Sequence, residues 1–360
     1  MTSVTRGSLA ILLFSLALMR PERLTAQVPV HSRAQEITIT GRVHTQFNTT
    51  SADGEIDSEF LMRRVRLTGE LHISDFVSGK VQPDFGEGKI TLKDAYLRLT
   101  FDPAFRATLG QFKRPFDLFE LTSSTQILVI ERAGGIRGLS TCSGPGGICS
   151  LSRFTEKLGY SDRDIGVLID GRDPSRKFRY MLSATNGAGA NKDEENDRKS
   201  FGGRAEFTPM TDLRVSGNVA LHDYSNDTTA ADEYAVAFGG DLEWGNYTEG
   251  IHLKVGAVAG DNWRNLSATG DPSKFLTAQG IVSYKYALAE NRFLGAVEPV
   301  ARVSWGDPDT DASDDEGLLF TPGLVIHFTG RNKIALNVDV WSPSQGNTEW
   351  SLKVQSYLHF

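Results

Sequence analysis

The chain has 360 residues, a formal net charge of -7 and an apolar fraction of 39%. The negative charge excludes wholesale binding of nucleic acid, so we expect no nucleic-acid partner. The 36 glycines and the many threonine, serine, asparagine and aspartate residues favour strands and turns over long helices.

The first 26 residues have the pattern of a secretory signal peptide. A basic start ending at Arg6 precedes the apolar run 9–19, and Ala26 stands at a suitable cleavage position. A retained membrane anchor is the alternative, but the run is too short to span a bilayer. We therefore expect residues 1–26 to be a signal peptide, 27–35 to be an N-terminal extension and 36–360 to form the exported domain.

Polar and apolar side chains alternate through most of the exported domain, which predicts strands. Long and short connections also alternate between them, with the long ones at 49–58, 86–89, 117–161, 187–199, 225–232, 261–273, 307–316 and 343–348. We expect about sixteen strands, near 36–48, 59–73, 76–85, 90–101, 105–116, 162–171, 177–186, 200–208, 213–224, 233–244, 247–260, 274–288, 296–306, 317–329, 333–342 and 348–360.

An even number of strands, with short turns on one side and long loops on the other, is typical of a transmembrane antiparallel β-barrel. Most of the expected strands have about 9–14 residues, enough for a tilted strand to cross a bilayer. A water-soluble sandwich also alternates, but the export signal and the loop asymmetry favour an all-β barrel in the bacterial outer membrane. The last strand, ending at Phe360, would close against the first and leave no open edge in lipid. Outer-membrane lipid and lipopolysaccharide would surround it.

Residues 60–133 carry a set of motifs that together are specific. The stretch contains "RRVRL", "PDFG", "KDAYL" and "GQFKRPFDLFELTSS" followed by "ER", and "DRDIGVLIDG" follows at 162–171. In these motifs the chain resembles the phosphate-selective porin O and P family. The resemblance implies a sixteen-stranded porin, a homotrimer, that takes up small hydrophilic solutes passively, anions such as phosphate or polyphosphate. Phe360 resembles the C-terminal signal that bacterial outer-membrane proteins present to the barrel-assembly machinery.

The longest connection, 117–161, is the third long loop, and loops of this length are usually functional. As in porins, we expect it to fold into the lumen and constrict it; a solvated surface loop is the alternative. Cys142 and Cys149 lie within it as "CSGPGGIC", and in an exported protein this spacing suggests a disulfide. Zinc binding is the weaker alternative, because two thiols do not complete a tetrahedral site.

Charges at the narrowest point of a pore determine which ions pass. We expect a basic lane there, because arginine side chains match phosphate oxygens. The expected solute-lining residues are Arg64, Arg66, Lys80, Arg98, Arg132 and Arg137. By alternation, Arg63 should face outward near the upper rim. Inward acidic residues are nearly as numerous as basic ones, so a general unselective pore stays open as an alternative.

Other functions have weaker support in the sequence. No nucleophile motif accompanies the serine, histidine and aspartate residues, so we expect neither an enzyme nor a cofactor. The histidines lack metal-ligand spacing. The acidic loops 191–197 and 307–317 lack a complete calcium-loop pattern and are expected to be solvated. A non-conducting structural or adhesin barrel is the other class of function to be distinguished from a pore.

Overall fold

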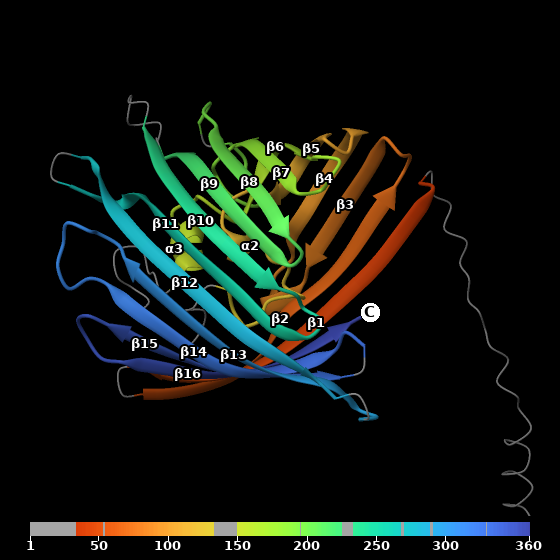
Figure 1. Ribbon diagram of the computed structural model, residues 1–360. Coiled ribbons are helices and arrows are strands. Elements are labelled where there is room, and N and C mark those ends of the chain that lie inside the picture. Colours follow the sequence, from red (N-terminus) through yellow and green to blue (C-terminus); the bar gives the residue numbers. More distant parts are fainter. Residues whose placement is uncertain are drawn as a thin grey trace, which may run out of the picture. The chain divides into compact units, whose positions relative to one another are not determined.

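A computed structural model describes residues 34–52, 55–132, 150–194, 196–224, 233–267, 270–288, 291–328 and 330–360. Within these ranges, sixteen strands form one closed antiparallel barrel (Figure 1), and each strand pairs with its neighbours in the sequence. The strands are β1 (Glu36–Ala52), β2 (Glu55–His72), β3 (Val77–Asp84), β4 (Thr91–Asp102), β5 (Phe105–Lys113), β6 (Arg163–Arg172), β7 (Phe178–Thr185), β8 (Ser200–Met210), β9 (Leu213–Asp223), β10 (Tyr234–Gly245), β11 (Gly250–Leu266), β12 (Pro272–Ala287), β13 (Leu294–Asp307), β14 (Gly317–Phe328), β15 (Lys333–Pro343) and β16 (Glu349–His359).

The barrel closes where β1 pairs with β16, with Arg42 opposite His359. The backbone N–H of Gly41 donates to the carbonyl of Phe360 (2.8 Å), and the N–H of Phe360 donates to the carbonyl of Gly41 (3.1 Å). The Phe360 ring lies over Gly41, so close that a Cβ on that glycine would come within 2.1 Å of it. The described strands therefore leave no open edge in the sheet, as lipid requires.

The two faces of the sheet have the expected polarity. Outward residues are apolar and exposed, with Phe60 85% exposed, whereas the inward residues Gln46, Lys353 and Gln355 are buried. This pattern confirms the predicted all-β barrel of sixteen strands. Two predicted connections are wrong in part. The β1–β2 ladder continues as far as the pair Ala52 and Glu55, well into the expected loop 49–58, and β11 extends to Leu266, well into the expected loop 261–273.

Two β-bulges change the direction of side chains in β2 and β4. In β2, Arg64 pairs with His44 and Met62 pairs with Thr45, so Arg63 is an extra residue in the ladder. A bulge places two consecutive side chains on the same face. The prediction that Arg63 faces outward is therefore wrong, because alternation is interrupted at this residue.

The bulge in β4 has the same effect on Lys93. Val81 pairs with Ala95 and Pro83 pairs with Leu92, which leaves Lys93 and Asp94 opposite the single residue Gln82. Asp94 forms ion pairs with inward side chains, and Lys93 interacts electrostatically with Arg66 on the inner face of β2. Both side chains therefore face the interior of the barrel.

The segment between β5 and β6 contains two short helices, α2 (Leu118–Leu121) and α3 (Leu151–Lys157). Asp117 caps α2 by accepting a hydrogen bond from the backbone of Phe119, and Ser150 caps α3 in the same way. Residues 133–149 of this segment lie outside the described residues. Among the described residues, no helix is long and apolar enough to cross a membrane.

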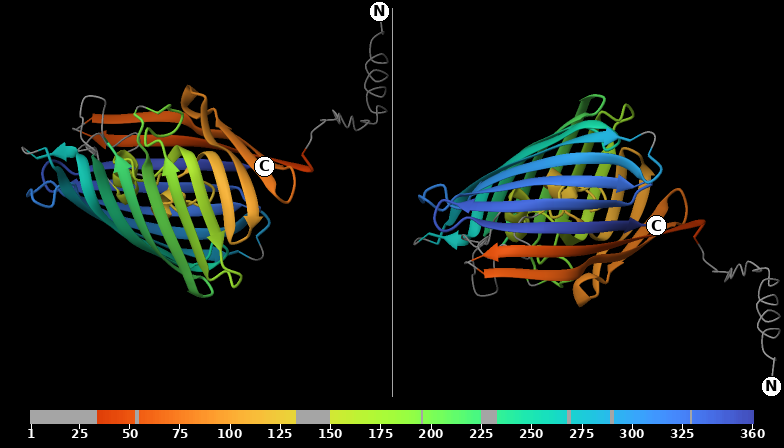
Figure 2. Two further views of the ribbon diagram at one scale, coloured as in Figure 1. Left: turned by 90° about the horizontal axis from the view of Figure 1, so that it is seen from above. Right: turned by 90° about the horizontal axis from the view of Figure 1, so that it is seen from below.

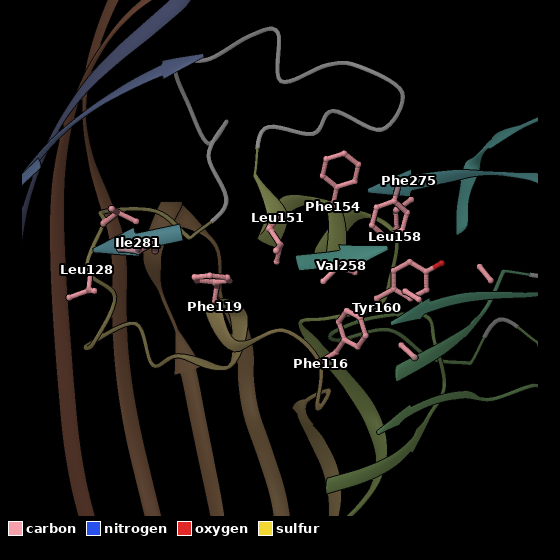
Figure 3. Close-up of a cluster of buried hydrophobic side chains, with 14 of the residues drawn as sticks. Phe116, Phe119, Leu128, Leu151, Phe154, Leu158, Tyr160, Val258, Phe275 and Ile281 are labelled. Carbon is pink, nitrogen blue, oxygen red and sulfur yellow. The ribbon is translucent and has the colours of Figure 1, made fainter. Parts of the chain in front are cut away.

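The segment packs its apolar side chains against the inner face of β9 to β13 (Figure 3). Phe154 stacks on Phe275 of β12, with ring centroids 5.3 Å apart, and its ring also lies against Gly306 of β13. The segment contributes Phe116, Phe119, Leu128, Val129, Leu151, Phe154, Leu158 and Tyr160 to this cluster, and the strands contribute Ala220, Ala235, Ala237, Val258, Phe275, Ile281 and Val300.

Hydrogen bonds tie the same segment to strands across the ring from β5 and β6. The backbone N–H of Ile130 donates to the side chain of Asn337 in β15 (2.7 Å). The Arg302 guanidinium, from β13, donates to the carbonyls of Glu131 (2.8 Å) and Arg132 (3.0 Å). Figure 2 shows both short helices within the ring of strands.

Candidate functional site

A row of basic side chains crosses the inner face of β1 to β6. Arg42 lies directly opposite Arg66 in the β1–β2 ladder, and Lys113 lies directly opposite Arg163 in the β5–β6 ladder. Lys93, turned inward by the bulge, interacts electrostatically with both Arg66 and Arg163. Because neighbouring strands are about 4.8 Å apart, these side chains form one positive surface.

The segment between β5 and β6 lies against this surface. The hydroxyl of Ser124 accepts hydrogen bonds from Arg42 (2.6 Å) and Arg66 (3.3 Å). Arg132 donates two hydrogen bonds to the carbonyl of Thr122 (2.6 and 3.1 Å), which fixes its guanidinium on the inner side of the segment. We call the resulting set the basic cluster; it consists of Arg42, Arg66, Lys93, Lys113, Arg132 and Arg163.

Four carboxylates neutralise part of the basic cluster. Their ion pairs are Arg66–Asp84 (2.6 Å), Arg163–Asp94 (2.7 Å), Arg163–Asp162 (3.5 Å), Lys113–Glu120 (3.2 Å) and Arg132–Glu120 (3.8 Å). Among the described residues, neither Arg42 nor Lys93 forms an ion pair. Six positive charges therefore meet four negative ones, and the surface keeps an excess of positive charge.

Glu120 remains ionised within the cluster. Burial alone would raise the pKa of its carboxyl group, but the adjacent Lys113 and Arg132 outweigh burial and lower that pKa to about 2. The segment therefore presents a permanent negative charge between two basic side chains at neutral pH.

The solute-lining residues predicted from the sequence lie in different parts of the structure. Arg66 and Arg132 belong to the basic cluster. Lys80 and Arg98 line a separate cavity of about 400 Å³ near the short-turn end, where Lys80 lies between Glu70 (3.5 Å) and Asp94 (3.4 Å). Arg98 donates to the hydroxyl of Thr108 (3.0 Å).

Arg64 faces inward as predicted, but it is only 3% exposed and pairs with Glu131 (3.0 Å) rather than lining open space. Arg137, Cys142 and Cys149 lie outside the described residues, so the role of that arginine and the disulfide stay predictions.

Hollow spaces lie on both sides of the segment. A cavity of about 600 Å³ extends from Thr122 and Ser123 to the short turns at Asp212 and Asn246. Another, of about 430 Å³, lies between Lys157 of α3 and the connection after β7. Water and small solutes can therefore approach the segment from either end of the barrel.

Sequence reasoning missed four members of the basic cluster as site residues: Arg42, Lys93, Lys113 and Arg163. The inward direction of Arg42 follows from alternation, and pairing of the first two strands places it beside Arg66. The inward direction of Lys93 depends on a bulge, for which the sequence has no clear signal. Among the described residues, no group of three or more histidine, cysteine, aspartate or glutamate residues is placed to hold a metal ion.

Comparison with solved structures finds porins of the same architecture at low sequence identity. The outer membrane channel DcaP of Acinetobacter baumannii is 13% identical, with a TM-score of 0.60, and 90% of this chain and 97% of that chain are covered. The trimer form of OmpT from Vibrio cholerae is 12% identical, with a TM-score of 0.57 over 90% of this chain and 99% of that one. OmpF of Salmonella typhi, in complex with daunomycin, is 12% identical, with a TM-score of 0.58 over 92% and 99%.

Comparison of sequences gives a more specific result. No curated protein matches the chain. A sequence model of the family described as phosphate-selective porin O and P matches residues 37–234, which is more than half of the chain. The protein therefore belongs to the phosphate-selective porin O and P family and is a diffusion channel of the outer membrane.

Proposed function

We propose that the channel passes small anions through a constriction formed by the basic cluster and the segment between β5 and β6. The observation that carries this proposal is the excess of positive charge where the segment lies against β1 to β6. On the opposite side, the segment packs on β9 to β13 through apolar side chains, so the solute path runs along the basic side.

The chemistry of the basic cluster suits anions with several oxygen atoms. Guanidinium groups match carboxylate and phosphate oxygens with two parallel hydrogen bonds. Arg42 and Lys93, which form no ion pair among the described residues, are the members most available to a solute. Several weak sites in a row allow an ion to be passed on without complete release, as conduction requires.

Assembly and processing are two further parts of the proposal. The fold resembles that of OmpT in its trimer form, which supports a homotrimer here, and sedimentation of the detergent-purified protein tests it. We also infer that residues 1–26 are removed on export, which N-terminal sequencing of the purified protein tests.

The reversal potential of single channels in a KCl gradient tests the proposed selectivity. A charge about 6 Å from a permeating ion contributes about 0.7 kcal/mol in water, or a roughly threefold change in relative permeability. The double variant Arg42→Ala with Lys93→Ala should therefore lower the anion-to-cation permeability ratio at least about threefold.

The matched control is Arg214→Ala, which removes an inward positive charge from the wall of the cavity of about 600 Å³. In that wide space a charge is screened within about 8–10 Å, so the ratio should hardly change. Equal effects of the two changes would contradict a selective constriction. They would favour a general diffusion pore, for which the acidic partners of the basic cluster are the supporting observation.

A further inference from the structure

The carboxylate of Glu131 lies between two consecutive arginines of β2, and its side chain is 1% exposed. Arg63 donates to it from Nε (2.5 Å) and from Nη2 (3.1 Å), and Arg64 donates from Nη2 (3.0 Å). Both arginines reach the same carboxylate because the bulge at Arg63 directs two consecutive side chains inward.

The backbone near Glu131 is held independently of this carboxylate. Arg302 donates to the carbonyls of Glu131 and Arg132, and Asn337 accepts from the N–H of Ile130. These contacts involve only backbone atoms of the segment. Loss of the Glu131 charge should therefore leave the end of the segment close to its present position.

The arginine pair has more capacity to bind anions than Glu131 uses. Arg63 also pairs with Glu87 (2.9 Å), but the Nε and Nη1 atoms of Arg64 are buried and have no hydrogen-bond partner among the described residues. Buried guanidinium N–H groups normally have acceptors. Arg64 could therefore bind an oxyanion if the carboxylate did not hold it.

The carboxylate stays charged under the conditions in which the channel works. Burial alone would raise the pKa of Glu131, but Arg63 and Arg64 outweigh burial and hold that pKa at about 2. At neutral pH the arginine pair therefore faces a fixed negative charge that belongs to the protein itself.

We propose that Glu131 is a positioning residue that occupies the Arg63–Arg64 pair as an internal anion, so that permeating anions are kept off this pair and use the basic cluster instead. Without this internal anion, the arginine pair would bind a solute oxyanion tightly and slow its passage. This inference rests on the proposed anion channel, since its main readout is block by an anion.

The variant Glu131→Gln tests this inference, because it keeps the shape of the side chain and removes its charge. The probe is inorganic phosphate, added to a chloride current through the full-length exported protein in planar bilayers. Phosphate should block the variant at a concentration about threefold lower than the wild type, the change expected for one added positive charge about 6 Å from the ion. The double variant R64Q/E131Q should lose this gain. If phosphate blocks E131Q at the same concentration as the wild type, the inference is overturned.

Two further variants separate the role of the charge from a loss of structure. Glu156→Gln removes a partly exposed carboxylate of α3 that pairs with Arg153 (3.5 Å). Phosphate should block the chloride current of this variant at the same concentration as in the wild type. Glu131→Asp keeps the charge on a shorter side chain. Phosphate should therefore block its chloride current at the wild-type concentration, while the noise of the open-channel current rises. Tightened block in E131D would contradict a role for the charge.

Assembly of each variant is checked by its heat-modifiable migration in gels. If E131Q does not assemble, the backbone contacts of Arg302 and Asn337 do not hold the segment without the Glu131 charge, and the inference would be overturned. A wild-type channel that prefers cations would contradict the proposed function, whereas the inference about Glu131 is judged from the difference between E131Q and the wild type.

Discussion

Single residues determine which basic side chains face the solute path. Strict alternation predicts the inward direction of Arg64 and Arg66 correctly, but it fails at Arg63 and Lys93, where one extra residue enters the ladder. A bulge depends on pairing with the neighbouring strand, which a single strand's sequence does not reveal. Sequence reasoning therefore predicted part of the site: it missed Lys93 because its direction depends on a bulge, and Arg42 because its place beside Arg66 depends on how the first two strands pair.

Asp117 gives the segment a pH dependence at the residue scale. Its side chain is 2% exposed, accepts hydrogen bonds from the N–H of Phe119 and the hydroxyl of Thr155 (both 2.8 Å), and lies near the negative charges of Glu120 and Asp241. Burial is the main cause that raises the pKa of Asp117 to about 7; the two nearby carboxylates also raise it, and the two hydrogen bonds lower it but do not outweigh burial. The protonated form is thus favoured by the fold.

A raised pKa means that the stabilising contribution of Asp117 is complete below its unfolded pKa of about 3.9 and is lost as the pH rises through about 7. We expect open-channel current noise to increase between pH 6 and pH 8 as the segment loosens. Asp117→Asn, which keeps the capping oxygen without the charge, should show no such increase. A noise level independent of pH in the wild type would contradict the expectation.

At the scale of elements, the segment between β5 and β6 depends on packing rather than on its own helices. Helices of four and seven residues are too short to be stable alone. The length of the connection predicted a functional loop, but not its docking surface. That surface uses glycines of the strands: Gly256 leaves room for the ring of Phe119, and Gly306 leaves room for the ring of Phe154.

Phe154→Ala should loosen this docking. Replacing a buried phenylalanine by alanine typically costs about 3–5 kcal/mol, here from the contact of α3 with β12 and β13. We expect a higher single-channel conductance and more current noise. Phe101→Ala, on the outward face of β4, serves as the control and should keep the wild-type conductance. Unchanged conductance in F154A would show that the segment does not limit the pore.

At the scale of the whole molecule, the sequence predicted the fold more completely than the site. Sixteen strands, their polarity and the closing pair β1–β16 follow from the period-two pattern and from the need to satisfy every backbone group in lipid. The excess of positive charge at the segment could not be obtained by counting inward residues, because many inward charges pair with each other outside the basic cluster. Arg204 with Asp241, and Arg302 with Asp339, are examples.

The most direct test of the central claim is the reversal potential of the wild-type channel between two KCl solutions of different concentration. A path lined by the basic cluster predicts a reversal potential with the sign of the chloride equilibrium potential, because chloride then permeates more readily than potassium. The addition of inorganic phosphate should reduce the chloride current. A reversal potential of zero, or one with the sign of the potassium equilibrium potential, would contradict the claim that the basic cluster determines which solutes pass.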